Sequence, residues 1–317
     1  MARIILNADD YGALSCIDDG IIEGIENGVV NSVSVLVNFP NIEEAIKKLL
    51  PYRNRVKIGL HFAITCGYLD IPNQYPTMCY FDEKHKFANI ESIRIHEVDP
   101  VEFEDCLKDQ IAKLGRLIGG IENIDHINSH QNILYLHQPF IEALCNVLAE
   151  YDAAGKKFHL RSPVPWSKSG LIYYKKRRSL LPIQRQAARY AKSWSLLHFG
   201  KGRCKTIWSL LRNATVVKMK DVKRVLSEQG YQTPFCLVDT YYGQPTKFIL
   251  NKLLEHLPED ETVEFMLHLA KDSDNNRERV NGINNGYLAT REKELQTLID
   301  HLPMGIRQVT YDPNSWA

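Results

Sequence analysis

The chain has 317 residues, enough for one large α/β barrel or two smaller domains. A hydrophobic content of 44% and a charged content of 24% are typical of a soluble globular protein, and no apolar run approaches the roughly 20 residues of a membrane span. The first apolar run, Ile4 to Leu6, soon meets two aspartates, so we expect no secretory signal. Seven cysteines without a CxxC pair indicate reduced thiols, so we expect a cytoplasmic protein.

The net charge of +1 conceals an uneven distribution. Between Ala153 and Lys220 there is no Asp or Glu, and 17 of the 39 Lys and Arg residues lie there. The rest of the chain therefore carries 22 basic and 38 acidic residues. We interpret residues 1–317 as a single domain with a basic insertion at about 165–220, mostly helical between Leu181 and Leu211.

Strand and helix patterns alternate along the whole chain. Short apolar or alternating runs predict strands at residues 3–10, 31–37, 55–62, 123–130, 157–163, 233–239, 261–268 and 306–311. Amphipathic periodicity predicts helices at residues 18–27, 41–50, 100–115, 139–151, 221–228, 246–257 and 288–302. A long polar segment at 67–98 is predicted to be a loop above the strand ends. This alternation predicts an α/β fold, a single (β/α) barrel-like domain that is an irregular TIM-type barrel.

Polar side chains gather at the C-terminal ends of the predicted strands. They are Asp9 and Asp10, His61, His130, Arg161, Asp239 and His268. In (β/α) barrels the active site lies on that face and takes residues from several strands. Adjacent strand residues point to opposite faces, so Asp9 and Asp10 are expected to have different roles.

This inventory suits metal-assisted amide hydrolysis. Two histidines and one carboxylate can hold a divalent ion that acidifies a water and polarises a carbonyl. A second carboxylate can take the proton of that water, another histidine can protonate the leaving amine, and an arginine can keep the base ionised. The same ligand set also suits non-haem iron oxygenases, but their usual β-sandwich-like fold does not match the alternating pattern.

Motifs along nearly the whole chain resemble those of the YdjC/ChbG-type carbohydrate deacetylases, a group that includes chitooligosaccharide deacetylases. The matching segments are Asn7–Gly12, Asn31–Asn38, Gly59–Phe62, His126–Gln131, Leu160–Arg161 followed by Pro163, Asp239–Gly243 and Glu264–His268. The resemblance implies a (β/α) barrel-like fold, one divalent metal ion (Mg²⁺ or Zn²⁺), removal of the N-acetyl group from an acetamido sugar or oligosaccharide, and a homodimer.

The resemblance also implies roles for individual residues. The implied metal ligands are Asp10, His61 and His130. The implied catalytic residues are the base Asp9, the acid His268 and Arg161, which supports the base. The residues assigned to substrate binding are Asn38, Asn132 and Asp239.

Two positions depart from the family pattern. Asn132 stands where the family usually has histidine, two residues after His130, and a strand would put both side chains on one face. Leu269 and Ala270 follow His268 where the family favours Pro-Gly. These departures leave the substrate open, and they motivate an alternative function, a sugar-binding or regulatory barrel that keeps the metal site without turnover.

The basic insertion suggests a further partner. Residues 175–205 combine clustered cations with Leu, Tyr and Trp, a pattern typical of basic amphipathic helices on anionic membranes. We therefore expect an anionic or lipid-linked acetamido sugar and peripheral contact with the inner membrane face. Pairing of the insertion with the acidic remainder of a dimer is the alternative. Nucleic acid is not expected, since no binding motif accompanies the charge.

Overall fold

The computed structural model describes residues 2–80, 82–166, 217–239, 241, 245–271 and 288–316. Its strands are β1 (Arg3–Tyr11), β2 (Ser32–Val35), β3 (Lys57–Phe62), β4 (His126–Ser129), β5 (His159–Leu160), β6 (Cys236–Val238), β7 (Thr262–Leu267) and β8 (Arg307–Gln308). Its α-helices are α1 (Ser15–Glu26), α2 (Ile42–Leu49), α3 (Pro100–Ile118), α4 (Gln138–Ala153), α9 (Met219–Glu228), α10 (Lys247–Glu255) and α11 (Leu288–His301).

The strands form one parallel sheet that curls into a barrel. The order in the sheet is β5-β4-β3-β2-β1-β7-β6, and β8 pairs with the start of β1. A parallel bridge between Pro165 and Leu237 joins the segment after β5 to β6. Seven strands therefore follow one another around the ring in chain order, which confirms the predicted barrel-like α/β fold.

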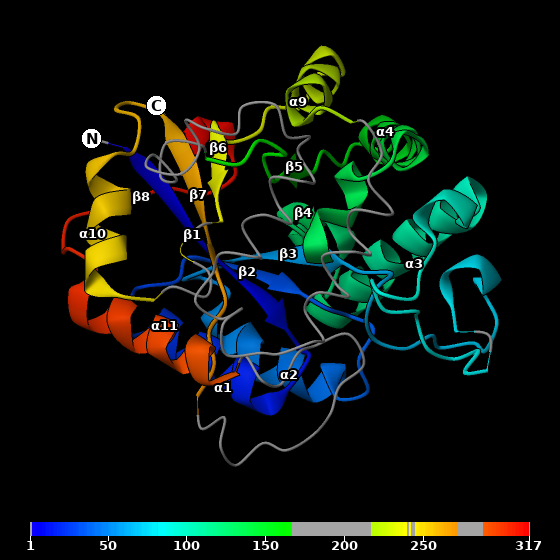
Figure 1. Ribbon diagram of the computed structural model, residues 1–317, viewed down its shortest axis with the longest axis horizontal. Helices are drawn as coiled ribbons and strands as arrows, with labels where there is room; N and C mark the ends of the chain where they lie inside the picture. The colour runs from blue at the N-terminus through cyan, green and yellow to red at the C-terminus, as the bar shows by residue number, and fades with distance from the viewer. Residues whose placement is uncertain are drawn as a thin grey trace.

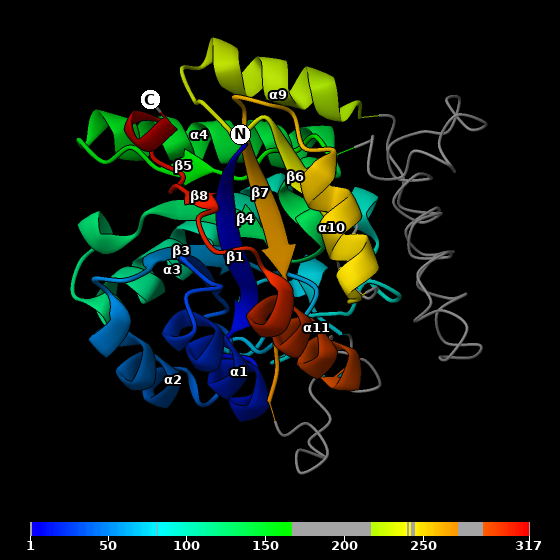
Figure 2. The same cartoon turned by 90° about the vertical axis from the view of Figure 1, so that its left-hand side faces the viewer.

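The helices lie around the outside of the strands, with α1, α2 and α11 on one flank and α4 and α9 on the opposite one (Figures 1 and 2). Their boundaries follow ordinary signals. Asp99 caps α3 by accepting a hydrogen bond from Val101 N–H, Pro100 is its first residue, and Gly119 ends it with φ +85°. The apolar side chains between the strands and these helices form the main hydrophobic core.

Much of the interior of the barrel is polar, unlike the apolar filling of most TIM barrels. Asn7, Ser34 and Asn128 come from three different strands and hydrogen-bond to one another in full burial. A Cβ atom at Gly59 would lie 2.4 Å from the imidazole of His126, so only glycine leaves room for that ring. Leu6 and Ala8, which flank Asn7 on β1, belong to the main core, whereas Ile5 packs with Val309 and Tyr311.

Some expectations fall outside the described residues. The helix predicted between Leu181 and Leu211 and the membrane contact assigned to residues 175–205 both lie there, as does nearly all of the basic insertion. The single-domain interpretation also stays a prediction. Among the helices that the structure describes, none has the length and apolar character needed to cross a membrane.

Candidate metal centre at the strand ends

Six side chains predicted at strand ends meet at one end of the barrel. Asp9 and Asp10 lie at the end of β1, His61 near the end of β3, and His130 directly after β4. Arg161 and His268 directly follow β5 and β7. All six are buried, with exposed fractions of 9% or less. Parallel strands bring their C-terminal ends to one edge, and this is why residues far apart in the chain converge.

Asp9 and Asp10 both reach the site because β1 is irregular at its end. The pairing of β1 with β2 shifts register between Ala8 and Tyr11, and Asp10 has φ 70°. Asp9 Oδ1 lies 3.7 Å from His61 Nδ1, and Asp10 Oδ1 lies 3.3 Å from His61 Nε2. The expectation that the two carboxylates point to opposite faces is therefore wrong, since a bulge with a left-handed residue breaks the alternation.

Arg161 forms a bidentate ion pair with Asp9. Arg161 donates from Nη1 to Asp9 Oδ2 at 2.9 Å and from Nη2 to Asp9 Oδ1 at 2.8 Å. The same guanidinium donates from Nε to Glu264 Oε1 at 2.7 Å, so it lies between two buried carboxylates. Burial alone raises the pKa of Asp9, but Arg161 and His61 outweigh it and lower that pKa to about 2. Asp9 is therefore ionised at neutral pH.

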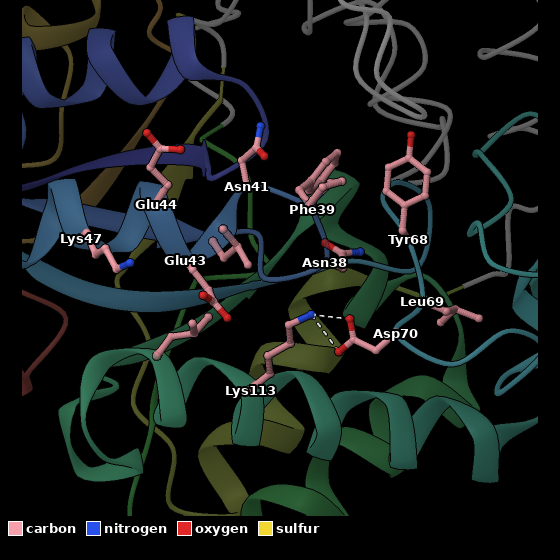
Figure 3. A pocket seen from close by; sticks show the side chains of 13 residues that line it. Asn38, Phe39, Asn41, Glu43, Glu44, Lys47, Tyr68, Leu69, Asp70 and Lys113 are labelled. Carbon is pink, nitrogen blue, oxygen red and sulfur yellow. Dashed lines mark hydrogen bonds and ion pairs between the residues drawn. The ribbon is translucent and has the colours of Figure 1, made fainter.

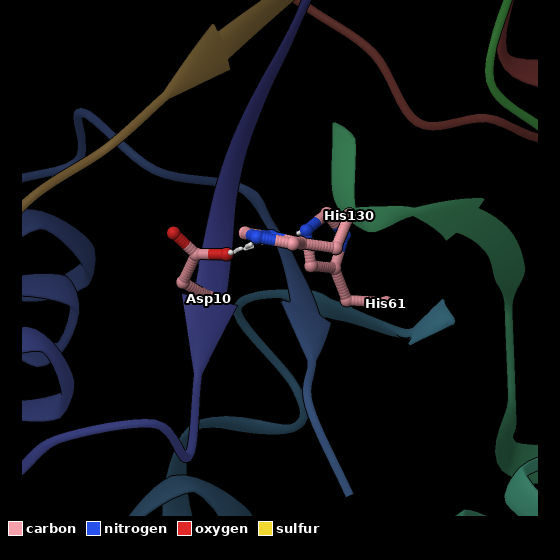
Figure 4. A group of neighbouring side chains, drawn as sticks. All are labelled: Asp10, His61 and His130. Atoms are coloured by element: carbon pink, nitrogen blue, oxygen red, sulfur yellow. Dashed lines mark hydrogen bonds and ion pairs between the residues drawn. The ribbon is translucent and has the colours of Figure 1, made fainter. Parts of the chain in front are cut away.

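Asp10 faces two histidines with one oxygen. Its Oδ1 lies 3.3 Å from His61 Nε2 and 3.2 Å from His130 Nδ1, and Figure 4 shows both rings directed at this carboxylate. Its Oδ2 accepts a hydrogen bond from Arg291 Nη2 at 2.5 Å. Burial raises the pKa of Asp10, but the charge of Arg291 and the histidine hydrogen bonds hold it well below its usual value.

The helix α11 supplies two buried ionisable side chains that the sequence interpretation missed. Arg291 contacts Asp10, and Glu294 Oε1 accepts a hydrogen bond from the backbone N–H of His268 at 2.7 Å. Their exposed fractions are 4% and 0%. Arg291 continues the spacing of Leu288, Leu295 and Leu298, so a charge on the apolar stripe of this helix was the available signal.

His268 completes the cluster from β7. Its Nε2 lies 3.9 Å from Asp10 Oδ2, on the oxygen that Arg291 also contacts. Burial and the nearby Arg291 lower the pKa of His268 to about 3. This imidazole is therefore neutral at pH 7 in the metal-free protein.

The three residues assigned to substrate binding lie differently. Asn132 is not in a strand, because β4 ends at Ser129 and both Gln131 and Asn132 have φ 55° within the 3₁₀ segment His130–Tyr135. The premise that His130 and Asn132 share a strand face is therefore wrong. Asp239 directly follows β6 and is half-buried.

Asn38 lies in the segment after β2, where its amide donates to the carbonyl of Cys66 at 2.7 Å. It lines a cavity of about 630 Å³ between α2, α3 and the segment after β3. Figure 3 shows Phe39 and Tyr68 along one wall of this cavity and the ion pair of Lys113 with Asp70 on the other. None of the six convergent residues lines it.

Asp10, His61 and His130 fit a divalent metal ion. Each offers one buried donor atom, and the three atoms lie within 4.8 Å of one another. His61 Nδ1 lies 2.6 Å from Asn128 Oδ1, which leaves Nε2 directed at Asp10. Two imidazole nitrogens and one carboxylate oxygen form an incomplete coordination set, which leaves positions for water or substrate.

Comparison with known proteins places the chain in a family. The model of the YdjC-like protein family matches residues 3–302. A crystal structure of an Enterococcus faecalis V583 protein with a proposed cellobiose-phosphate cleavage activity superposes with a TM-score of 0.67 over 99% of both chains. At 18% identity this likeness supports the barrel fold alone.

Curated relatives cover part of the chain. A carbohydrate deacetylase of Brevibacillus brevis is 29% identical over 149 residues, which are 47% of this chain and 56% of that protein. A carbohydrate deacetylase of Oceanobacillus iheyensis is 25% identical over 150 residues, which are 47% of this chain and 62% of that protein. The chain thus spans a little over half the length of the curated relatives it matches.

Proposed function

The chain belongs to the YdjC-like family, and from this membership we propose that it is a metal-dependent hydrolase that removes the N-acetyl group from an acetamido sugar. One observation carries the proposal. The donor atoms of Asp10, His61 and His130 lie within 4.8 Å of one another, next to a carboxylate that Arg161 keeps ionised. The names of the curated relatives favour a sugar as the substrate.

In this proposal Asp10, His61 and His130 hold the metal ion. A bound Mg²⁺ or Zn²⁺ would polarise the amide carbonyl and lower the pKa of a water beside it. Imidazole nitrogens favour Zn²⁺, and the carboxylate oxygen is also suited to Mg²⁺. Arg291 keeps one oxygen of Asp10 engaged, so that Oδ1 alone faces the two histidines.

Asp9 acts as the general base. Its Oδ1 accepts hydrogen bonds from Asn7, Asn128 and Arg161, whereas Oδ2 accepts from Arg161 Nη1. The less occupied Oδ2 is therefore the atom that takes a proton from the attacking water. A carboxylate with a pKa of about 2 is a weak base, so this transfer needs a water that is already acidified.

His268 acts on the leaving nitrogen. The reaction breaks the C–N bond of the amide, and the departing amine needs one proton, the same number that the attacking water gives up. Burial and Arg291 lower the pKa of His268 to about 3, so its imidazole is not protonated in advance, and the proton that it passes to the amine is the one that the attacking water releases through Asp9. Asp239 and Asn132 bind the sugar in this proposal. The sugar is anionic or lipid-linked, and the active form of the enzyme is a homodimer.

Two substitutions separate metal binding from chemistry. We expect His130→Ala to weaken Zn²⁺ binding by at least about tenfold, since it removes one of three donors. Asp9→Asn should retain the metal, since its amide oxygen can still accept from Asn128, and should lose acetate release, since an amide cannot take the proton of the water. Metal content and acetate release from a panel of acetamido sugars measure both effects.

The exposed His256→Ala and Asp19→Asn are the matched controls, and both should behave like the wild type. Near-wild-type turnover of Asp9→Asn would show that Asp9 is not the base. Undiminished zinc binding by His130→Ala would remove His130 from the metal site.

A further inference from the structure

We propose that Asn128 is a positioning residue that couples the general base to a metal ligand. Its side chain contacts both groups at once. Asn128 Oδ1 lies 2.6 Å from His61 Nδ1, and Asn128 Nδ2 lies 3.3 Å from Asp9 Oδ1. Asn128 is fully buried, so water does not compete for these hydrogen bonds.

The charge of Asp9 determines which way this amide points. An ionised carboxylate only accepts hydrogen bonds, so the NH₂ group of Asn128 must face Asp9. The reversed amide would set its carbonyl oxygen against Asp9 and leave Nδ2 facing His61. Ser34 Oγ, 2.7 Å from Nδ2, also receives a hydrogen bond in the first orientation.

The orientation of Asn128 in turn fixes the tautomer of His61. Because the carbonyl oxygen of Asn128 accepts, His61 Nδ1 must carry the proton. The lone pair of the neutral ring then lies on Nε2, the nitrogen directed at Asp10 Oδ1 at 3.3 Å. Asp9 thus holds His61 in its metal-binding form through one side chain, without touching the metal itself.

A buried hydrogen-bond network keeps Asn128 in place. Ser34 Oγ lies 3.0 Å from Asn7 Nδ2 and 2.9 Å from His126 Nε2, and Asn7 Nδ2 donates to Asp9 Oδ1 at 2.8 Å. Three of these four residues are 0% exposed and Asp9 is 1% exposed. The proposed reaction assigns no chemical step to the motif residues Asn7, Ser34 and His126. In this inference their shared role is to hold Asn128 in place.

The inference rests on the proposed metal site, so its test includes a measurement that needs no metal. Burial lowers the pKa of His61, but Asp9 and Asp10 outweigh it and raise that pKa above its usual value. The tautomer of His61 is therefore read from long-range ¹H–¹⁵N spectra of metal-free protein labelled at histidine, at a pH high enough that the ring is neutral. Zn²⁺ affinity is measured separately by competition with a chelator. Both are applied to the wild type, Asn128→Leu and Asn128→Asp. Asn146→Leu is the control. Asn146 is exposed, and its side chain donates to Glu104, which does not belong to the hydrogen-bond network around Asn128.

In the wild type and the control we expect His61 protonated on Nδ1. Asn128→Leu should give a mixture of tautomers and bind Zn²⁺ about 10- to 100-fold more weakly. Asn128→Asp keeps an acceptor for His61, so the tautomer should persist and the zinc affinity should stay within about threefold of the wild type. Acetate release should nevertheless fall by about tenfold or more, because a carboxylate replaces the donor to Asp9.

The proposal is overturned if wild-type His61 carries its proton on Nε2, or if Asn128→Leu keeps both tautomer and affinity. It is also overturned if Asn128→Asp weakens zinc binding as much as Asn128→Leu does, since this would indicate a merely structural role. If Asn128→Leu does not fold, the proposal is tested by comparing the His61 tautomer, zinc affinity and acetate release of Asn128→Asp with those of the wild type. Failure of the wild type to bind zinc would refute the metal site, and the tautomer would still test the coupling.

Discussion

Arg291 sets a positive charge against the carboxylate that faces the two histidines. Its Nη2 lies 2.5 Å from Asp10 Oδ2, and both side chains are buried. Removing one partner of a buried ion pair leaves an uncompensated charge, which typically costs about 3–5 kcal/mol of folding free energy. A metal ion on the other oxygen of Asp10 would compensate part of the same charge.

We therefore predict that Arg291→Met destabilises the metal-free protein by about 3–5 kcal/mol and that saturating Zn²⁺ recovers part of this loss. Urea unfolding with and without zinc measures the difference. Arg224→Met is the control, since Arg224 pairs with Glu228 on the surface, and it should cost about 1 kcal/mol or less. An equal loss with and without zinc would mean that Arg291 does not balance the charge of Asp10.

The residues of the site differ in how far the sequence predicts them. Asp9, Asp10, His61, His130, Arg161 and His268 were found because each ends a strand, and parallel strands end at one edge. Arg291 and Glu294 lie on a helix, so no strand rule places them near the site. Their burial depends on how α11 packs against the barrel, a long-range property that local periodicity does not contain.

At the scale of elements, the turn from β1 to α1 is held by a buried carboxylate. Asp18, in the first turns of α1, accepts a hydrogen bond on Oδ1 from the backbone N–H of Gly12 at 2.6 Å. Gly12 has φ 92°, and this turn directly follows Asp9 and Asp10. Burial raises the pKa of Asp18 to about 7.

The raised pKa of Asp18 makes the folded state less stable as the pH rises. Between about pH 4 and pH 7 the folded state binds a proton at Asp18 that the unfolded state has released. Stability from this group is therefore present below about pH 4 and is lost as the pH rises through 7. Asp18→Asn imitates the protonated form and keeps the acceptor for Gly12.

We predict that Asp18→Asn stabilises the protein more at pH 8 than at pH 5, by about 2 kcal/mol. Unfolding midpoints of the wild type and the variant at both pH values test this. Asp19→Asn is the control, since Asp19 is the exposed neighbour that pairs with Lys48, and its effect should be small at both pH values. Equal destabilisation by Asp18→Asn at both pH values would contradict the prediction.

At the scale of the whole molecule, the alternation of strands and helices predicted the fold class, and the structure confirms the barrel-like sheet. It did not predict how the barrel closes. The contact between the segments at Pro165 and Leu237 pairs residues 72 positions apart through a single bridge, which no periodic pattern marks. The polar interior was also not anticipated, although Asn7, Ser34 and Asn128 alternate with apolar residues along their strands.

The charge distribution of the molecule stays a prediction. The basic residues between Ala153 and Lys220 lie mostly outside the described part of the chain, so membrane contact and pairing within a dimer are both still open to experiment. In the described site the ion-paired carboxylates outnumber the arginines by one before a metal binds. Asp9, Asp10 and Glu264 are paired with Arg161 and Arg291.

The most direct test of the proposed function is acetate release from acetamido sugars by the metal-free wild type, before and after addition of Zn²⁺ or Mg²⁺. We predict no release above background from the chelator-treated protein and recovery when one of these ions is added back. Release at the same rate by metal-free and metal-loaded protein would contradict the account, since Asp10, His61 and His130 would then not serve as ligands of a catalytic metal.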